Sequence, residues 1–335
     1  MINNEFLKDK RILITGISGY LGSNLLHELL KYDVHSIRGV SRNESKLSEL
    51  QEKVTDDRVR LYIGDIRDLN RMQKAVEGVD IIYHCAAIKH IDLAQRNVFE
   101  AIQTNVIGTQ NLIDLAIENN TEQFIGFDTD KSCGGTLNVY GTTKKLMREQ
   151  IITANYIKGS HKTKFGCMRW GNILDSSMSV IPKWKESIKN NTISITEPRM
   201  TRFNLSINEV IQFTLSCQEN MVGGEVFIPE MKSYNLYELA NSFIEKYGNK
   251  LTNVIYIKNR GSEKKDEDLL DIGEFERIYK IKSGYVVVPE EKYLQEFGLK
   301  YNYDKLPYTD RLYSLKRYSS KDAIKLTKQD LKEMI

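Results

Sequence analysis

The sequence predicts an α/β fold, a Rossmann-like doubly wound parallel sheet with a smaller C-terminal α/β substrate-binding part. Short apolar runs alternate with helical patterns through residue 173, and this alternation is typical of a parallel sheet covered by helices. A glycine-rich turn follows the first apolar run, at residues 16–22. After residue 173 the regular alternation ends, which indicates a differently built part.

The chain is long enough for one large α/β domain with an appended part, since it has 335 residues. We expect residues 1–173 to form the nucleotide-binding domain, with a segment near residues 193–220 returning to it. Residues 174–335 would mainly form the substrate-binding part. The two parts are expected to interleave, because the sequence contains no internal repeat and no low-complexity linker.

Composition excludes several classes of function. The net charge is +3, with 41% hydrophobic and 28% charged residues, which is ordinary for a soluble enzyme and gives no argument for nucleic acid. The four cysteines form no CxxC pair and the five histidines show no metal-like helical spacing, so we expect free thiols and no metal. Without a signal peptide or an apolar run of membrane-spanning length, we predict a cytoplasmic protein that binds no membrane.

The first expected strand, residues 11–15, leads into a turn with glycines three residues apart and then into an amphipathic helix. The first glycine permits a tight turn, the second allows backbone to approach a pyrophosphate, and the third allows close helix packing. The helix N-terminus would face the phosphates. A dinucleotide site is therefore favoured over an ordinary strand-to-helix turn, and we expect it to include Gly16, Ser18, Gly19, Tyr20, Leu21 and Gly22.

The second expected strand, residues 35–41, ends in Ser41 and Arg42. An NAD-preferring site usually has an acidic residue there, about 20 residues after the glycines, for the ribose hydroxyls. A guanidinium can instead pair with a 2′-phosphate and stack on adenine. The sequence therefore predicts NADP, with Ser41 and Arg42 in its site, although Arg42 also reads as a solvated residue opening a charged helix.

Two further strands end in residues that suit the same cofactor. The strand at residues 58–66 ends in Asp65 and Ile66, which could contact adenine, although Asp65 could also cap a helix expected at residues 68–77. The strand at residues 79–87 ends in Ala86 and Ala87, whose small side chains leave room for ribose. In a long helix expected at residues 97–119, Asn105 lies on the apolar face and should satisfy buried backbone.

The most informative stretch is residues 128–144, between a buried strand at residues 123–127 and a helix. Tyr140 and Lys144 are four residues apart, so a helix places them on one face. A nearby ammonium lowers the pKa of a phenol, which would make Tyr140 a base for a sugar hydroxyl whose carbon gives hydride to nicotinamide. Lys144 could hold the ribose, and Thr129 adds a hydroxyl to the proton path. Tyrosine and lysine at this spacing are also common on surface helices, but ligands bind at this edge of parallel sheets.

The motifs GxxGxxG, GDIRD, HCAAIKH, TDK, YGTTK and RWGN, in this order, resemble those of the extended short-chain dehydrogenase/reductase superfamily. The segments AAIKHI and TDK, residues 200–203 and residues 317–333 are similar to the polysaccharide-biosynthesis dehydratases, the inverting UDP-N-acetylglucosamine 4,6-dehydratases. The resemblance implies that Tyr140 deprotonates the sugar O4 as C4 is oxidised by NADP. Lys131 would then remove the C5 proton and Asp130 would protonate the leaving C6 hydroxyl, before hydride returns to C6.

The resemblance also implies how the substrate is held. Lys89 and Arg202 match positions that contact the nucleotide sugar, and a guanidinium suits a diphosphate. Asn172 matches a position near the cofactor amide and the sugar. A UDP-sugar is therefore the expected partner. Superfamily members commonly associate through the helices equivalent to residues 97–119 and 140–158, so a homo-oligomer is expected.

Several residues depart from the family pattern and leave the sugar open. Asp128 stands where serine is usual, adding an acid beside the cofactor, and Gly134 and Gly135 stand where a proline is expected. Residues 173–179 lack the arginine and glycines of a substrate-facing loop. Cys133 lies in this stretch without a visible partner base, so we expect it to be unreactive. The charged run at residues 263–268 is interpreted as a solvated loop.

Two other functions stay open. A UDP-sugar 4-epimerase also carries the TDK and YxxxK motifs, but it returns hydride to C4 and needs no base at C5. Lys131 beside Asp130 favours elimination. A regulatory protein that only binds the nucleotide is disfavoured, because every expected cofactor and catalytic group is present.

Overall fold

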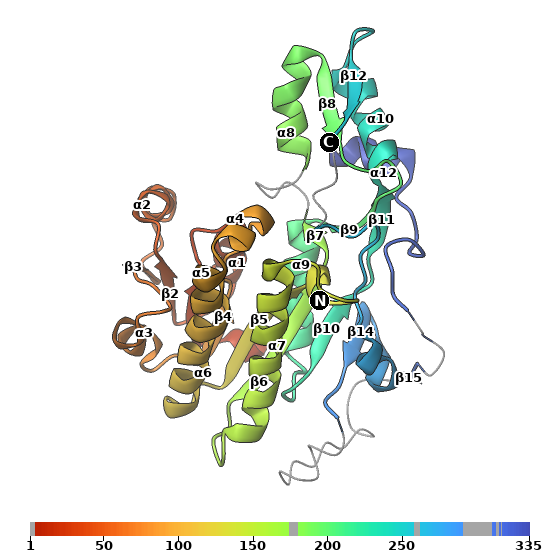
Figure 1. Cartoon of the computed structure of the whole chain (residues 1–335). Coiled ribbons are helices and arrows are strands. Elements are labelled where there is room, and N and C mark those ends of the chain that lie inside the picture. The colour runs from red at the N-terminus through yellow and green to blue at the C-terminus, as the bar shows by residue number, and fades with distance from the viewer. Residues whose placement is uncertain (1–3, 174–179, 258–261, 291–309, 313–314, 316) are drawn as a thin grey trace.

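The computed structural model describes residues 4–173, 180–257, 262–290, 310–312, 315 and 317–335. Its centre is a ten-stranded sheet with the order β15-β13-β14-β10-β6-β5-β4-β1-β2-β3 (Figure 1). The parallel strands are β1 (Arg11–Thr15), β2 (Ser36–Ser41), β3 (Val59–Ile63), β4 (Ile81–His84), β5 (Gln123–Thr129), β6 (Lys164–Trp170) and β10 (Val226–Pro229). The antiparallel extension consists of β13 (Ile278–Ile281), β14 (Gly284–Val287) and β15 (Asp310–Arg311).

The parallel half confirms the predicted Rossmann-like sheet. Parallel strands covered on both faces are apolar nearly throughout, and β1 shows this in Ile12, Leu13 and Ile14, which are fully buried. The register aligns the ends of neighbouring strands, because Thr15 pairs with Val40 on one side and His84 on the other. The residues that follow these strands therefore meet along one edge of the sheet.

Helices cover both faces of the sheet. They are α1 (Tyr20–Leu29), α2 (Glu44–Lys53), α3 (Leu69–Val76), α4 (Ile91–Arg96), α5 (Val98–Ile102), α6 (Gly108–Glu118), α7 (Val139–Ile157) and α9 (Ile207–Gln218). The strand order reverses between β3 and β4, and right-handed crossovers then place α3 and α6 on the face opposite α1. Helix α6 packs against α3 and α7, and α9 packs against α1.

The helix expected at residues 97–119 differs from the prediction in its middle. It begins at Val98 and ends at Glu118, but residues Gln103–Ile107 form a π-helical turn between α5 and α6. One side chain of this turn, Asn105, is completely buried and bonds to a neighbouring loop. A π-turn is often found where a helix serves a functional site, and this one lies against the helix that carries Tyr140.

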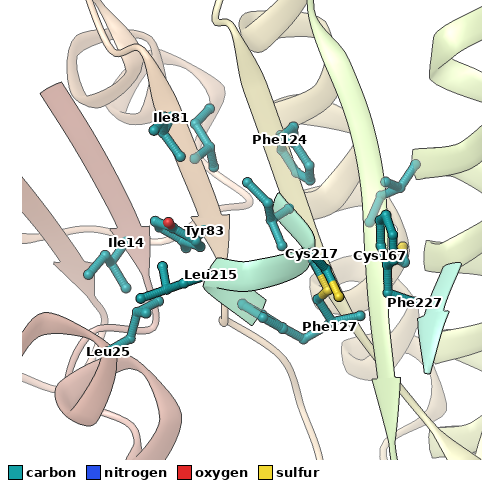
Figure 2. Packing of buried hydrophobic residues seen from close by; sticks show 14 of the residues in the cluster. Ile14, Leu25, Ile81, Tyr83, Phe124, Phe127, Cys167, Leu215, Cys217 and Phe227 are labelled. Carbon is teal, nitrogen blue, oxygen red and sulfur yellow. The ribbon is translucent and has the colours of Figure 1, made fainter. Parts of the chain in front are cut away.

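The main hydrophobic core lies on both sides of the parallel strands. Figure 2 shows Ile14, Tyr83, Phe124, Cys167 and Phe227 of five strands lying near side chains of α1 and α9. Leu25 of α1 and Leu215 of α9 are 1% and 0% exposed. Burial of such side chains contributes about 1.5–3 kcal/mol each before the cost of chain entropy.

A second core lies above the carboxyl edge of the sheet (Figure 1). It is formed by α8 (Val180–Ser187), β8 (Thr192–Ile195), α10 (Leu236–Tyr247), β12 (Asn253–Tyr256) and α12 (Lys328–Met334). A three-stranded sheet of β7 (Asn172–Ile173), β9 (Thr201–Leu205) and β11 (Lys232–Asn235) completes the set of sheets in the described parts. The domain boundaries given above remain a prediction. Within the described residues, no helix combines the length and apolarity needed to cross a membrane.

Candidate active site

A pocket of about 1100 Å³ lies between the carboxyl ends of the parallel strands and the second core. Thr129 and Trp170, at the ends of β5 and β6, line it from below, and Trp184 of α8 and Leu239 of α10 line it from above. Of the residues predicted for cofactor, chemistry and substrate, all line this pocket except Asp65 and Asp130. The fold therefore assembles one site from segments that are far apart in the sequence.

The glycine-rich turn has the conformation that its sequence requires. Gly16 adopts a positive φ of +68°, and a Cβ there would lie 2.8 Å from the backbone of Ala86. A Cβ on Gly22 would lie 2.6 Å from the carbonyl oxygen of Gly16. No side chain caps α1 at Gly19, so the helix N-terminus lines the pocket with backbone alone, which suits a phosphate. These residues fit a dinucleotide.

The adenosine end of the expected cofactor site combines a cation with an acid. The Arg42 guanidinium lies 3.5 Å from the Asp65 carboxylate and its side chain is 48% exposed. Burial raises the pKa of Asp65, but hydrogen bonds from Arg67 and the charge of Arg42 lower it by more, so the pKa lies below its usual range. The suggested helix-capping role of Asp65 is wrong, because Asp68 caps α3. Asp65 instead holds the backbone and guanidinium of Arg67.

Tyr140 lies in the first turn of α7, which the Asn138 side chain caps by accepting from the Gly141 amide. A Cβ on Gly141 would collide with the carbonyl oxygen of Lys131, so the glycine allows the helix to start directly against the Asp130 turn. Lys144 follows one turn later, buried, with its Nζ 3.1 Å from Met147 Sδ. Tyr140 and Lys144 thus share one helix face, as the spacing predicts.

The prediction that Lys144 lowers the pKa of Tyr140 is wrong for the protein without a cofactor. Burial raises the pKa of Tyr140 to about 12, and the charge of Lys131 and a hydrogen bond with Thr129 lower it only in part. Burial also lowers the pKa of Lys144. Removal from water penalises the phenolate more than nearby charges favour it, so the phenol is neutral until further positive charge enters the pocket.

Asp130 and Lys131 form an ion pair at the end of β5, in which Asp130 is completely buried and the Lys131 side chain is 19% exposed. The Lys131 ammonium donates to Asp130 Oδ1 at 3.0 Å and to Asn172 Oδ1 at 3.2 Å. The Thr129 hydroxyl also donates to Asp130 Oδ1, at 3.0 Å. Asp130 Oδ2 is buried without a hydrogen-bond partner. Although burial lowers the pKa of Lys131, the carboxylates of Asp130 and Glu267 raise it by more, to well above its ordinary value.

The charged run at residues 263–268 is not a solvated loop, contrary to the prediction. Glu267 is 2% exposed and lines the pocket together with Glu263 and Lys264. The backbone carbonyls of Lys264 and Lys265 accept hydrogen bonds from Arg202, each at 3.0 Å. The run is charged because it supplies groups to a buried site, and its side-chain pattern alone does not distinguish this from a surface loop.

The three predicted substrate residues all line the pocket, but they differ in how far other protein groups already engage them. Arg202 Nε lies 4.0 Å from Glu267 Oε1, and much of its guanidinium is engaged by backbone carbonyls. Asn172 contacts Lys131, as described above. Burial lowers the pKa of Lys89, which lines the pocket. The altered loop at residues 174–179 lies outside the described residues.

Two buried arginines hold the Asp128 carboxylate, so it is not a free acid beside the expected cofactor. Its Oδ2 accepts from Arg148 at 3.1 Å and from Arg169 at 2.9 Å. Arg169 also forms two 2.8 Å bonds with the Glu274 carboxylate, and Arg148 reaches Asp271 at 3.1 Å. Burial raises the pKa of Asp128 and of Glu274, but the arginine charges lower both by more.

This network ties α7 and β6 to residues 271–274, and sequence reasoning missed its arginines. Cys133 lies beside it, completely buried, and burial raises the pKa of its thiol. The Cys133 thiol and the carboxylates of Asp271 and Glu274 come within 4.8 Å of one another. We assign them to structure rather than to a metal, since arginines already bind both carboxylates.

The prediction for Asn105 is confirmed. Its amide oxygen accepts from the Ile88 backbone at 2.8 Å, and its amide nitrogen donates to the Ile88 carbonyl and to Thr143, each at 3.0 Å. Asn105 therefore fixes the loop that carries Lys89 against the helix that carries Tyr140. The π-turn described above places this amide where it reaches both.

Comparisons with known proteins agree with this geometry. A family model described as "Polysaccharide biosynthesis protein" matches residues 12–289. A Methanocaldococcus jannaschii protein named as an uncharacterized membrane protein is 38% identical, over 99% of this chain and 97% of its own. A Campylobacter jejuni UDP-N-acetylglucosamine 4,6-dehydratase (inverting) is 35% identical, over 86% of this chain and 85% of its own. A Rickettsia felis UDP-glucose 4-epimerase is 30% identical, over 98% and 95%.

Solved structures share the same architecture. The X-ray structure of Pen from Bacillus thuringiensis has a TM-score of 0.88 and 30% identity, with 98% of each chain covered. The dTDP-glucose 4,6-dehydratase DesIV from Streptomyces venezuelae, solved with NAD, has a TM-score of 0.69 and 18% identity, over 89% of this chain and 94% of its own. This second likeness supports the fold alone.

Proposed function

We propose, since the chain belongs to the polysaccharide biosynthesis protein family, that it is a UDP-N-acetylglucosamine 4,6-dehydratase that inverts C5. Its relatives make it an enzyme of the nucleotide-sugar dehydratase and epimerase type. The observation that carries the narrower proposal is the ion pair of Asp130 and Lys131, with the Lys131 ammonium 3.0 Å from the buried carboxylate. An epimerase can also carry these two residues, but its reaction needs no acid–base pair at C5 and C6, whereas elimination does.

Tyr140 and Thr129 would act first, at the sugar O4. Tyr140 takes the O4 proton while C4 is oxidised, and Thr129, bonded to Asp130, links the two acid–base groups. In the protein alone the phenol is neutral, because burial raises its pKa to about 12. A cationic ring bound beside it favours the phenolate, so its activation depends on the cofactor.

Lys131 and Asp130 would carry out the elimination. A ketone at C4 makes the C5 proton acidic, and the Lys131 amine removes it while Asp130 gives a proton to the departing C6 hydroxyl. Moving the shared proton from Lys131 to Asp130 produces both required forms at once. Asn172, which accepts from Lys131 at 3.2 Å, orients the amine after this transfer. General acid–base catalysis by one positioned group is typically worth about 10²–10⁴-fold.

A nicotinamide dinucleotide would be held by the Gly16–Gly22 turn, Ala86, Ala87 and Lys144, and it would supply reversible oxidation at C4 and reduction at C6. We further propose that it is NADP. The support is Arg42, whose partly exposed guanidinium lines the pocket at the end of β2. Asp65 lies beside it and is already engaged by Arg67, which reduces its capacity to bind ribose hydroxyls.

The alternative is a UDP-sugar 4-epimerase, which the Rickettsia relatives favour by name. Proton NMR of the reaction with UDP-N-acetylglucosamine tests the proposal against it. Elimination and reduction at C6 produce a methyl group next to C5, which gives a new doublet. An epimerised product would keep the C6 hydroxymethyl signals and change only the ring couplings at C4, and this result would refute the dehydratase.

A further inference from the structure

Glu267 is a buried carboxylate that the chemistry above does not use. It reaches the pocket from residues 263–268, far in sequence from the strand that carries Lys131. Its side chain is 3% exposed. Its Oε2 atom is buried without a hydrogen-bond partner. A buried polar atom left unpaired costs free energy, and more so in a charged group, so its place in a pocket wall indicates a role toward a ligand.

The backbone around Glu267 holds the side chain in place. Its amide donates to the Ser320 hydroxyl at 2.9 Å, and its carbonyl accepts from the Ser320 amide at 2.8 Å. The Ser320 hydroxyl lies 2.7 Å from that of Thr201, in the strand that carries Arg202. The carboxylate is thus presented by a fixed segment rather than by a mobile loop tip.

The pKa of Glu267 lies above its ordinary value, chiefly because the carboxyl is buried. Lys131, Asp130, Arg202 and Lys264 are the charged groups that act on it. Burial raises the pKa of Glu267, the charge of Lys131 lowers it, the charge of Asp130 raises it again, and the net shift is upward.

Inversion at C5 needs such an acid. The base that removes the C5 proton lies on one face of the sugar, so a proton delivered from the other face must come from a different group. Lys131 and Glu267 come from different segments, β5 and residues 263–268, that line the same pocket. They are close enough to interact electrostatically.

We propose that Glu267 is a catalytic acid that protonates C5 after elimination, on the face opposite Lys131. This inference rests on the proposed dehydratase function. Lys131 takes the C5 proton and becomes an ammonium, the C6–O bond breaks, and Asp130 supplies the proton that completes water. After reduction at C6, the C4–C5 enolate takes the carboxyl proton of Glu267 and forms the C5–H bond. After the product leaves, Lys131 returns a proton to the Glu267 carboxylate. Asp130 regains the proton that Tyr140 took from O4, through the Thr129 hydroxyl.

The test compares Glu267→Gln with wild type on UDP-N-acetylglucosamine in D₂O. Wild type should give a product of inverted C5 configuration with deuterium at C5. In Glu267→Gln the dehydrated product should form about 10²–10⁴-fold more slowly. The product that does form should have mixed C5 configuration, because the enolate left after reduction at C6 then takes its proton from solvent on either face. Equal product rate and equal C5 configuration in the variant would overturn the proposal.

Asp266→Asn is the matched control. It neutralises the neighbouring carboxylate and keeps a carbonyl oxygen for the Thr201 hydroxyl, which donates to Asp266 at 2.6 Å. Its product rate should remain near that of wild type, and an equal loss in both variants would overturn the assignment to Glu267. If Glu267→Gln does not fold, the proposal is tested with Glu267→Asp and with the configuration of the wild-type product. Glu267→Asp keeps the carboxylic acid and should invert C5 at a reduced rate. Loss of inversion in this variant would contradict the proposed role of the acid.

The wild-type product separates this proposal from the one on which it rests. A dehydrated product with retained C5 configuration needs only one acid–base group at C5, so it would refute the role of Glu267 and leave the dehydratase intact. An isomer of unchanged mass would refute the dehydratase itself.

Discussion

The Lys131 ammonium lies 3.0 Å from the buried carboxylate of Asp130. This contact places an acid and a base one proton transfer apart, and Lys131 lines the pocket together with Tyr140. Removing Lys131 should therefore stop elimination without stopping oxidation at C4.

Lys131→Met should lower dehydrated product at least about 10²-fold, since one general base is typically worth about 10²–10⁴-fold. The bound nicotinamide should still become reduced when UDP-N-acetylglucosamine is added, measured by its absorbance. Lys74→Met, on the exposed face of α3, should behave as wild type. Unchanged turnover in Lys131→Met would show that another group is the C5 base.

Arg42→Ala should weaken NADP binding about 10–100-fold, because hydrogen bonds to charged groups contribute about 1.5–3 kcal/mol. NAD binding should change little, since NAD has no 2′-phosphate. Titration calorimetry on the apo protein gives both affinities. Arg96→Ala, at the exposed end of α4, is the control. A wild-type preference for NAD, or an equal loss for both cofactors in Arg42→Ala, would refute the choice of NADP.

Asp128→Asn should destabilise the fold by about 3–5 kcal/mol, the usual cost of removing one partner of a buried ion pair. It leaves Arg148 and Arg169 without the carboxylate that both now contact. Urea unfolding measures the change in the free energy of unfolding. Asp114→Asn, on the exposed side of α6, should change it by less than about 0.5 kcal/mol. A similar small change in Asp128→Asn would show that the arginines find other partners.

The same network sets a pH dependence. The pKa values of Asp128, Asp271 and Glu274 are all lower in the folded protein than their ordinary values. A depressed folded pKa contributes stability above the unfolded pKa, near pH 4 for carboxyls, and this stability is lost as pH falls through the folded values. The free energy of unfolding of Asp128→Asn should therefore fall by less than that of wild type between about pH 5 and pH 2, because one depressed carboxyl pKa is absent.

The exposed apolar side chains on α5, the π-helical turn that follows it and α7 support a proposed interface between copies of the chain. Phe99 is 66% exposed, Leu146 48% and Ile107 43%. Phe99→Glu combined with Leu146→Glu should shift the protein to monomers, measured by light scattering. Leu251→Glu, at a site 70% exposed between α10 and β12, is the control. A wild-type protein that is already monomeric would contradict the interface.

Local patterns made much of the site predictable. The glycine spacing at residues 16–22 predicts a turn whose backbone leaves no room for Cβ atoms. The four-residue spacing of Tyr140 and Lys144 reports one helix face. Both features depend on residues that are close in the sequence, so they can be predicted from a single sequence. The same holds for the apolar strands, whose burial on both faces makes each run continuous.

Long-range partners were not predictable in the same way. Arg169 and Glu274 are separated by 105 positions, and no local pattern relates them. Glu267 looked like part of a solvated charged run, because sequence shows the charge of a segment and not the pocket over which it folds. The pKa of Tyr140 was predicted in the wrong direction for the same reason, since burial depends on tertiary packing.

The mass of the product made from UDP-N-acetylglucosamine tests the central claim most directly. If Asp130 and Lys131 direct the sugar toward elimination, wild-type protein with bound NADP should give one product lighter than the substrate by one water. A product of unchanged mass would contradict the dehydratase and identify the protein as an epimerase.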